Sequence, residues 1–466
     1  MANAVHSLEP VAAIFPGDGA TSALAAFVAE TAFDDIPAAA IERLRDCFLD
    51  LVGNSAFASA RAESSPPLRA AIQQMDNPDG PATAIGEARG YAWHYAALLN
   101  GAYAHTLDFD DTNFGHPGAP VIPAALAEAE RLGVSGAIFL TAVAVGYEVF
   151  CRIGAALGAG GYERGFHGTA ISGIFGAVAA VGKLRGLDAG TIENAFGLAL
   201  SKASGSMQYL ENGSWNKRVH PGFAAHDALL CVTMAEAGVV GAANAIEGRY
   251  GVLTSFTSTP QPEVLLADLG RSWKLLHTAI KPYPSCRFTH AAVDAALALR
   301  SRFAPNDLPR AAMRIALSPV AWKIVGERLP AKLAPRNAVD AQFSVYFQVA
   351  AAWLDGQVAW DSYLRIAAPE LVAMTPRIVV TSDPTIRKLG ARLEVELDGE
   401  TDALAIEHAL GEPENPLRWD DLLAKFMSLA VPVYGDASAR EIAVAVHAVS
   451  GAPRMTDIIR RLRSAR

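Results

Sequence analysis

The sequence predicts a mainly α-helical protein, with a large all-α domain built from both ends of the chain and a smaller inserted α+β lid domain. Apolar residues recur at helical spacing from about residue 20 to residue 240. Segments typical of strands appear only after residue 275, and helical spacing returns after residue 408. We therefore expect the all-α domain to comprise residues 1–275 and 408–466, and the lid domain residues 276–407. At 466 residues the chain is also longer than a single hydrophobic core usually supports.

The helices expected before residue 240 are strongly apolar. In residues 41–51, Leu44, Phe48 and Leu51 fall on one stripe. Further helices are expected at residues 122–132, 138–153, 171–182 and 192–204. The last two are rich in Gly, Ala and Ser, which lets neighbouring helices approach closely. Apolar residues on all sides of a helix indicate a position at the centre of a bundle.

Strand-like segments distinguish the inserted part of the chain. Residues 313–317, 377–381 and 392–397 alternate or are rich in β-branched residues, as half-buried strands are. Asp398 and Gly399 predict the tip of a hairpin after the last of these strands. Further helices are expected at residues 342–354, 417–429 and 457–463.

Composition and charge exclude several classes of protein. Hydrophobic residues make up 51% of the chain and charged residues 19%, which suits a folded core and not a disordered chain. The net charge of −9 provides no basic surface for nucleic acid. The four cysteines are widely spaced and form no CxxC pair, which favours a reducing compartment.

Neither a targeting segment nor a membrane span is expected. The N-terminus lacks a basic start followed by an apolar run. The longest apolar stretch, residues 168–182, has 15 residues, fewer than the roughly 20 that cross a bilayer. We therefore expect a cytoplasmic protein that does not associate with membranes.

The densest group of polar side chains lies near residue 110. If residues 104–112 are helical, His105, Asp108 and Thr112 share one face, and the following loop returns His116 toward it. Such a group suits acid–base chemistry. One alternative is an acidic helix end whose carboxylates bond backbone amides. Another is a magnesium site, although that ion usually draws oxygen ligands from more elements than this segment supplies.

Two further histidine and lysine positions suit a catalytic site. His167 precedes a glycine-rich helix, whose N-terminus would lower the pKa of a nearby histidine. A packed or capping histidine is the alternative. Lys217 belongs to a basic cluster beside an HPG turn, for which a solvated surface is the alternative.

The segment at the expected domain junction, residues 280–290, also carries polar groups. Clefts and ligands usually lie at such junctions. Arg287 can grip a carboxylate through paired hydrogen bonds. Cys286 has no base adjacent in sequence, so inert packing is its expected role.

These motifs occur along the chain in an order that is informative in itself. The phrases are NGAYAHTLDFDDT, HPG, FHGTAISGIFGAVAAVGKLRGL, KRVHPGFAAH, KPYPSCRFTHAAVDAAL and AQFSVYFQVA. In this order they resemble the MmgE/PrpD family, and the resemblance extends to both termini. Members of that family include 2-methylcitrate dehydratase, cis-aconitate decarboxylase and iminodisuccinate epimerase.

The resemblance implies a homodimer with a helical domain and an α+β lid that needs no metal and no cofactor. By matching motif positions, it implies a site containing Asp108, Thr112, His116, His167 and Lys217.

Two departures separate the chain from the decarboxylase of this family. Cys286 aligns with a further histidine of that enzyme. Asn113, Phe114 and Gly115 replace longer spacers before His116. Both departures make decarboxylation of cis-aconitate a less expected reaction.

The chemistry that the resemblance implies is the formation or quenching of a carbanion beside a carboxylate. The enediolate needs cationic partners in place, and a base must lie within hydrogen-bond reach of the proton. We expect Lys217, Lys281 and Arg287 to hold the substrate carboxylates, and His167 or Lys217 to move the α-proton.

A general acid is also needed if the reaction is a dehydration. We expect His116, oriented by Asp108, to protonate the departing hydroxyl, because a neighbouring carboxylate raises the pKa of a histidine. Asp110 and Asp111 are expected to give structural support.

The leading hypothesis is a cofactor-independent dehydratase acting on a small hydroxylated di- or tricarboxylate such as 2-methylcitrate. An epimerase with Lys217 and Tyr162 as opposed bases, a decarboxylase and a non-catalytic helical scaffold are the alternatives. Substrate contacts are expected from Thr112, Tyr162, Lys281, Ser285, Cys286 and Arg287.

Overall fold

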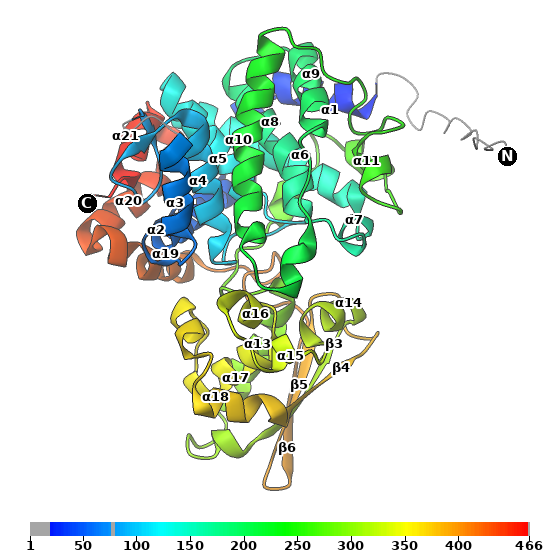
Figure 1. The fold of residues 1–466 in the computed structure, drawn as a ribbon, viewed down its shortest axis with the longest axis vertical. Helices are drawn as coiled ribbons and strands as arrows, with labels where there is room; N and C mark the ends of the chain where they lie inside the picture. The colour runs from blue at the N-terminus through cyan, green and yellow to red at the C-terminus, as the bar shows by residue number, and fades with distance from the viewer. Residues whose placement is uncertain (1–18, 76–79, 465–466) are drawn as a thin grey trace, which may run out of the picture.

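The computed structural model describes residues 19–75 and 80–464. Figure 1 shows a large helical region above a smaller region in which helices pack on a sheet. The protein is therefore mainly α, with a small α+β part, as the sequence predicts. The division at residues 276 and 407 stays a prediction.

The helical region begins with twelve helices and one short hairpin. The hairpin pairs β1 (Ala82–Thr83) with β2 (Gly90–Tyr91). The helices are α1 (Ala20–Glu30), α2 (Ala38–Arg61), α3 (Ser65–Met75), α4 (Trp93–Thr106), α5 (Gly118–Leu132), α6 (Gly136–Leu157), α7 (Gly160–Glu163), α8 (Gly168–Leu184), α9 (Ala189–Leu200), α10 (Asn216–Glu236), α11 (Val252–Ser255) and α12 (Glu263–Leu266).

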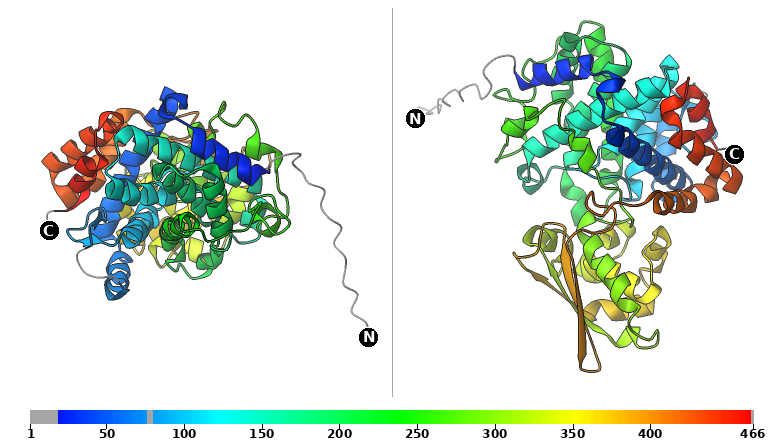
Figure 2. Two further views of the ribbon diagram at one scale, coloured as in Figure 1. Left: turned by 90° about the horizontal axis from the view of Figure 1, so that it is seen from above. Right: turned by 180° about the vertical axis from the view of Figure 1, so that it is seen from behind.

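The C-terminal end of the chain returns to this region. Helices α19 (Trp419–Tyr434) and α20 (Asp436–His447) lie beside α2, and α21 (Met455–Ile459) lies beside α5 and α20. The right view of Figure 2 shows this C-terminal part of the chain, in orange to red, next to the blue N-terminal helices. Phe426 and Ile442 belong to the same buried apolar cluster as Phe48. Both ends of the chain thus build one core, as the sequence predicts.

The α+β region is organised around a four-stranded sheet. Its strands are ordered β4 (Ile378–Ser382), β3 (Ala312–Leu317), β5 (Ala391–Leu397), β6 (Glu400–Ile406). β3 pairs in parallel with β4 and antiparallel with β5, and Asp398 and Gly399 form the tip of the β5–β6 hairpin with positive φ angles. The remaining helices here are α13 (His290–Arg300), α14 (Pro319–Ala321), α15 (Pro330–Leu333), α16 (Ala338–Gln342), α17 (Val345–Asp355) and α18 (Pro369–Met374).

The helices expected at residues 342–354 and 192–204 differ from the structure. The one expected at residues 342–354 is interrupted at Phe343 and Ser344, because the Ser344 side chain accepts a hydrogen bond from the backbone N–H of Phe347 and caps α17. The helix expected at residues 192–204 ends at Leu200.

Helix α6 is the only helix in the described part of the chain that is long and apolar enough to cross a membrane by length and composition. Of its most apolar window, 89% is buried inside the protein. It packs on α8, where Gly146 and Gly176 let the backbones approach closely. The apolar sequence of α6 is accounted for by this position in the core.

The crossing of α4 and α10 places the candidate site. A Cβ atom on Gly222 would lie 2.4 Å from the carbonyl oxygen of Leu98, and one on Gly101 would lie 2.8 Å from Cα of Gly222. Only glycine permits this approach. It brings His105, one turn after Gly101, near enough to Lys217 on the first turns of α10 for the lysine charge to lower the pKa of His105.

Candidate active site

A left-handed turn follows α4 and carries the first carboxylate of the site. Helix α4 ends at Thr106, and Asp108 has a φ of 51°. The expectation that residues 104–112 form one helix is therefore wrong. Residues other than glycine rarely adopt this conformation, and it concentrates at functional sites. It directs the Asp108 side chain toward groups from two other segments.

Two ammonium groups converge on one oxygen of Asp108. Oδ1 lies 2.7 Å from Nζ of Lys217 on α10 and 2.6 Å from Nζ of Lys281. Lys281 also donates to the backbone carbonyl of Asp108 at 2.9 Å. Burial raises the pKa of Asp108, but the two lysines outweigh it and hold that pKa well below the ordinary value. The second oxygen, Oδ2, is buried and has no hydrogen-bond partner among the described residues.

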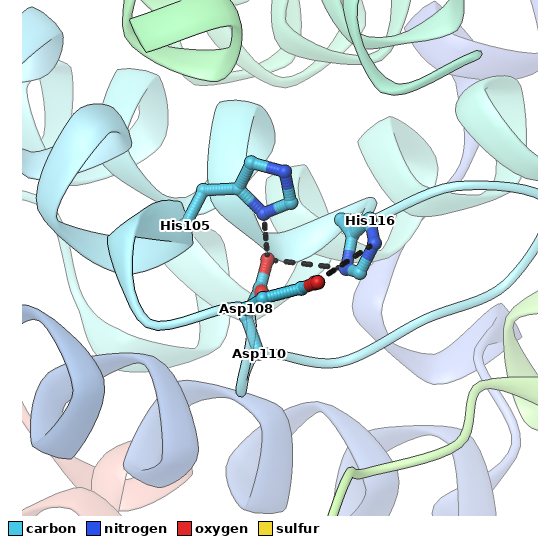
Figure 3. Close-up of side chains that lie close together, drawn as sticks. All are labelled: His105, Asp108, Asp110 and His116. Atoms are coloured by element: carbon cyan, nitrogen blue, oxygen red, sulfur yellow. Dashed lines mark hydrogen bonds and ion pairs between the residues drawn. The ribbon is translucent and has the colours of Figure 1, made fainter. Parts of the chain in front are cut away.

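Asp110 links two histidines on the other side of the cluster. Its Oδ2 lies 2.8 Å from Nδ1 of His105 and 3.3 Å from Nδ1 of His116. Figure 3 shows both imidazole rings directed toward the carboxylates of Asp108 and Asp110. The carboxylate nearest to His116 is thus Asp110, a residue expected to give structural support, and not Asp108, which was expected to orient His116. Asp108 lies 3.9 Å from the opposite nitrogen, Nε2, of His116.

The hydrogen bonds of His116 fix its protonation. Nδ1 lies 2.9 Å from the backbone carbonyl of Asp111. Because a carbonyl only accepts, Nδ1 of His116 carries the hydrogen, and Nε2 of the neutral ring keeps a lone pair. Burial lowers the pKa of His116, and Lys281 and Lys217 lower it further against the opposing effect of Asp110. The expected rise in the pKa of His116 is therefore wrong, and its ring is neutral near neutral pH.

Asp111 has the supporting position that the sequence predicts. It accepts hydrogen bonds from the hydroxyl of Tyr147 at 2.7 Å and from the backbone N–H of Gly118 at 3.1 Å. Burial raises its pKa to about 7. Asp111 thus anchors the start of α5 to α6.

His167 lies on the far side of His105. The two rings stack with centroids 5.5 Å apart, and Nδ1 of His167 lies 3.2 Å from Nδ1 of His220. Burial lowers the pKa of His167 well below its ordinary value, and it lowers the pKa of His220 to about 4. Both imidazoles are therefore neutral near neutral pH.

Three members of this group were not among the residues predicted for the site. His220 and Tyr209 surround His167, and the buried hydroxyl of Tyr209 has no hydrogen-bond partner in the described part of the chain. His105 was noted in the sequence but not assigned a role. The spacing of His220 three residues after Lys217 places both on one face of α10, and that spacing is the sequence signal that could have found His220.

Of residues 285–287, only Cys286 lies near the cluster around Asp108, whereas the side chains of Ser285 and Arg287 contact other parts of the protein. Cys286 lies near Asp108 and Lys281, and burial raises the pKa of its thiol to about 11, so it is not a thiolate nucleophile. Ser285 instead pairs with the hydroxyl of Thr289 at 2.9 Å. Arg287 forms a paired ion contact with Glu412, with Nε 2.6 Å from Oε1. The expected roles of Ser285 and Arg287 in holding substrate are not supported, because both side chains are engaged elsewhere.

Thr112 and Tyr162 flank the cluster. The backbone of Thr112 pairs with Ala279 in an isolated β-bridge, which joins the Asp108 turn to the segment that carries Lys281. Tyr162 lies on α7, half-buried, and its pKa is raised by burial and by the neighbouring Cys286 and Asp108. Both residues lie beside the site without a hydrogen bond from their side chains to the cluster.

Four side chains of the site are close enough together to be considered as metal ligands. One ligand atom each from His105, Asp108, Asp110 and His116 lies within 4.8 Å of the others. Two ammonium groups already contact Asp108, and both histidines direct Nδ1–H at Asp110 or a carbonyl. A divalent cation would meet these positive charges and N–H groups. The arrangement fits an anionic substrate better than a metal ion.

Two family models cover most of the chain. The MmgE/PrpD N-terminal domain matches residues 22–265, and the MmgE/PrpD C-terminal domain matches residues 283–450. The chain belongs to the MmgE/PrpD family. The Asp108 turn, His167 and Lys217 fall within the N-terminal match, and Cys286 within the C-terminal one.

Curated relatives in this family match along most of their lengths. The cis-aconitate decarboxylase-like protein oryM of Aspergillus oryzae is 30% identical over 455 residues, covering 90% of this chain and 92% of the relative. A cis-aconitate decarboxylase of Aspergillus terreus is 28% identical over 472 residues, covering 94% of each. The cis-aconitate decarboxylase of Homo sapiens is 28% identical and covers 72% of each chain.

Proposed function

We propose that this MmgE/PrpD protein is a cofactor-independent lyase that removes water from a small hydroxylated di- or tricarboxylate such as 2-methylcitrate. The observation that carries the proposal is the pairing of a neutral imidazole, His116, with the ammonium groups of Lys217 and Lys281 around one carboxylate. An α,β-elimination of water requires a base for the α-proton and an acid for the departing hydroxyl in the same site. The proposed setting is the cytoplasm, and the proposed assembly is a homodimer.

His116 is the proposed base. Its Nε2 keeps a lone pair because Nδ1–H is committed to Asp110 and to the carbonyl of Asp111. Nε2 accepts the α-proton of the substrate, and the electron pair of the broken C–H bond moves into the carboxylate as an enediolate. Asp110 stabilises the imidazolium that forms.

Lys217 is the proposed acid. Burial lowers the pKa of its ammonium group, and Asp108 opposes this effect, so Lys217 donates a proton more readily than an exposed lysine. When the enediolate collapses, the C–O bond breaks and Nζ of Lys217 supplies the proton for the departing hydroxide. Lys281 and the hydroxyl of Tyr209 are proposed to bind substrate carboxylates.

Decarboxylation is the second candidate, because the curated relatives are named cis-aconitate decarboxylases or decarboxylase-like. That reaction needs a proton donor after loss of CO2 but no base for a C–H bond. The neutral state of His116 and the presence of Cys286 in place of a further histidine favour dehydration over decarboxylation.

Turnover of three acids separates the candidates. Purified protein is incubated with 2-methylcitrate, citrate and cis-aconitate while absorbance of the unsaturated acid and release of CO2 are recorded. The dehydratase produces absorbance with a hydroxylated acid and no CO2. Release of CO2 from cis-aconitate, without turnover of the other two acids, would replace this proposal by the decarboxylase.

A further inference from the structure

His220 lies behind His167, on the first turns of α10. Gly205, with a φ of 115°, accepts a hydrogen bond from the backbone N–H of His167 at 2.8 Å. A Cβ atom on Gly205 would lie 2.4 Å from Cβ of Ala170 and 3.6 Å from Nδ1 of His220. This tight packing holds the Nδ1 atoms of His167 and His220 3.2 Å apart.

A hydrogen bond between two neutral imidazoles has only two forms. In one form Nδ1–H of His220 donates to Nδ1 of His167, which places the hydrogen of His167 on Nε2. In the other form Nδ1–H of His167 donates, and Nε2 of His167 keeps a lone pair. The direction of this one bond decides whether His167 offers the site a donor or an acceptor.

The surroundings favour the first form. Nδ1 of His105 donates to the Asp110 carboxylate, so the buried Nε2 of His105 already carries a lone pair, as Nε2 of His116 does. An acceptor on His167 would add a third lone pair to the same site. The carboxylates of the substrate and the enediolate formed from one of them offer acceptors only, and a donor binds them. Of the two ring nitrogens of His220, only Nδ1 has a hydrogen-bond partner among the described residues. A hydrogen on Nδ1 of His220 is therefore satisfied.

We propose that His220 is a positioning residue that fixes the tautomer of His167, by donating Nδ1–H to it, so that His167 presents Nε2–H to the substrate. The catalytic purpose of this hydrogen rests on the proposed function. In that reaction, Nε2–H of His167 donates a hydrogen bond to the enediolate oxygen while His116 holds the α-proton. A neutral imidazole acts as such a donor without transferring its own proton.

Nitrogen NMR tests the tautomer without reference to any reaction. The wild-type protein is labelled with ¹⁵N in histidine, and the His167 signals are assigned by their loss in His167→Gln. We expect a protonated Nε2 and an unprotonated Nδ1 in His167 near neutral pH. A hydrogen on Nδ1 of His167, in all molecules or in half of them, would overturn the proposal.

Kinetics of two variants test the role of His220. His220→Leu lacks the donor and should lower kcat at least ~10-fold with a smaller change in KM, less than the ~100-fold cost of removing an oxyanion donor outright. His220→Asn can donate from nearly the same position and should recover most of kcat. A His220→Leu variant with wild-type kcat, or equal loss in both variants, would overturn the positioning role.

His226→Leu is the matched control. His226 lies on the same helix, pairs with Asp227 at 2.9 Å and has no contact with His167. It should keep the wild-type kcat and the wild-type His167 signals. If the NMR result is as expected but none of the three acids is turned over, the proposed function fails while the tautomer assignment stands.

Discussion

Oδ1 of Asp108 lies 2.7 Å from Nζ of Lys217, and the two residues come from opposite sides of the Gly101–Gly222 helix crossing. Asp108 lies in the left-handed turn that follows α4, whereas Lys217 lies in the first turn of α10. This pair keeps an acid charged inside the protein, within reach of the neutral His116. The reaction proposed above depends on that combination.

The plot of kcat/KM against pH should be bell-shaped. Burial lowers the pKa of His116 below its ordinary value of 6.5 and that of Lys217 below its ordinary value of 10.5. kcat/KM should therefore rise with pH as His116 loses its proton below 6.5, and fall as Lys217 loses its own below 10.5. The measurement is kcat/KM over the full stable pH range. An acid limb above 6.5 would contradict the assignment of His116 as base.

Stability should also depend on the proton of Asp111. Its pKa of about 7 in the folded protein exceeds the ordinary 3.8, so the folded chain keeps a proton that the unfolded chain releases. This contribution is complete below pH 3.8 and is lost as pH rises to about 7. Asn cannot lose a proton, so the free energy of unfolding of Asp111→Asn should improve relative to wild type across this window. Urea unfolding at several pH values measures it; a constant difference would contradict the prediction.

Gly222→Ala should destabilise the protein and disturb the site together. Its new Cβ would meet the carbonyl of Leu98, and overpacking of this kind costs about 1–3 kcal/mol. Urea unfolding gives the free energy, and kcat reports the site. Gly451→Ala is the control, because a Cβ there meets nothing within 4 Å. Equal stability of the two variants would show that the crossing tolerates a side chain.

Chelation should leave the reaction unchanged. The ammonium groups of Lys217 and Lys281 both contact Asp108, so a cation bound there would meet two positive charges. Dialysis against EDTA, followed by assay with and without added Mg²⁺ or Zn²⁺, should give one rate. If EDTA abolishes activity and an added metal restores it, the prediction is wrong. His105, Asp108, Asp110 and His116 would then be the expected ligands of that metal.

The helices could be predicted from sequence because their apolar spacing is local. The expected segment at residues 138–153 lies within α6, and the strand expected at residues 392–397 lies within β5. The end of α4 could not be predicted in this way, since the spacing of His105, Asp108 and Thr112 suits a helix. The left-handed turn at Asp108 is instead accompanied by partners far along the chain, such as Lys281, 173 residues away.

The membership of the site was predicted better than its roles. Asp108, His116, His167 and Lys217 do lie together, but the partner of His116 is Asp110. Two aspartates two residues apart are indistinguishable by composition, and only the path of the turn decides which faces the imidazole. Arg287 is engaged by Glu412, 125 residues away, which no local pattern reveals.

The most direct test is kcat/KM of His116→Ala and Lys217→Ala on the acid that the wild type turns over, with circular dichroism and urea unfolding to verify the fold. Each variant should remain folded and lose at least ~100-fold in rate, the lower end of what a positioned acid or base contributes. Near-wild-type turnover by either folded variant would contradict the assignment of this cluster as the catalytic site.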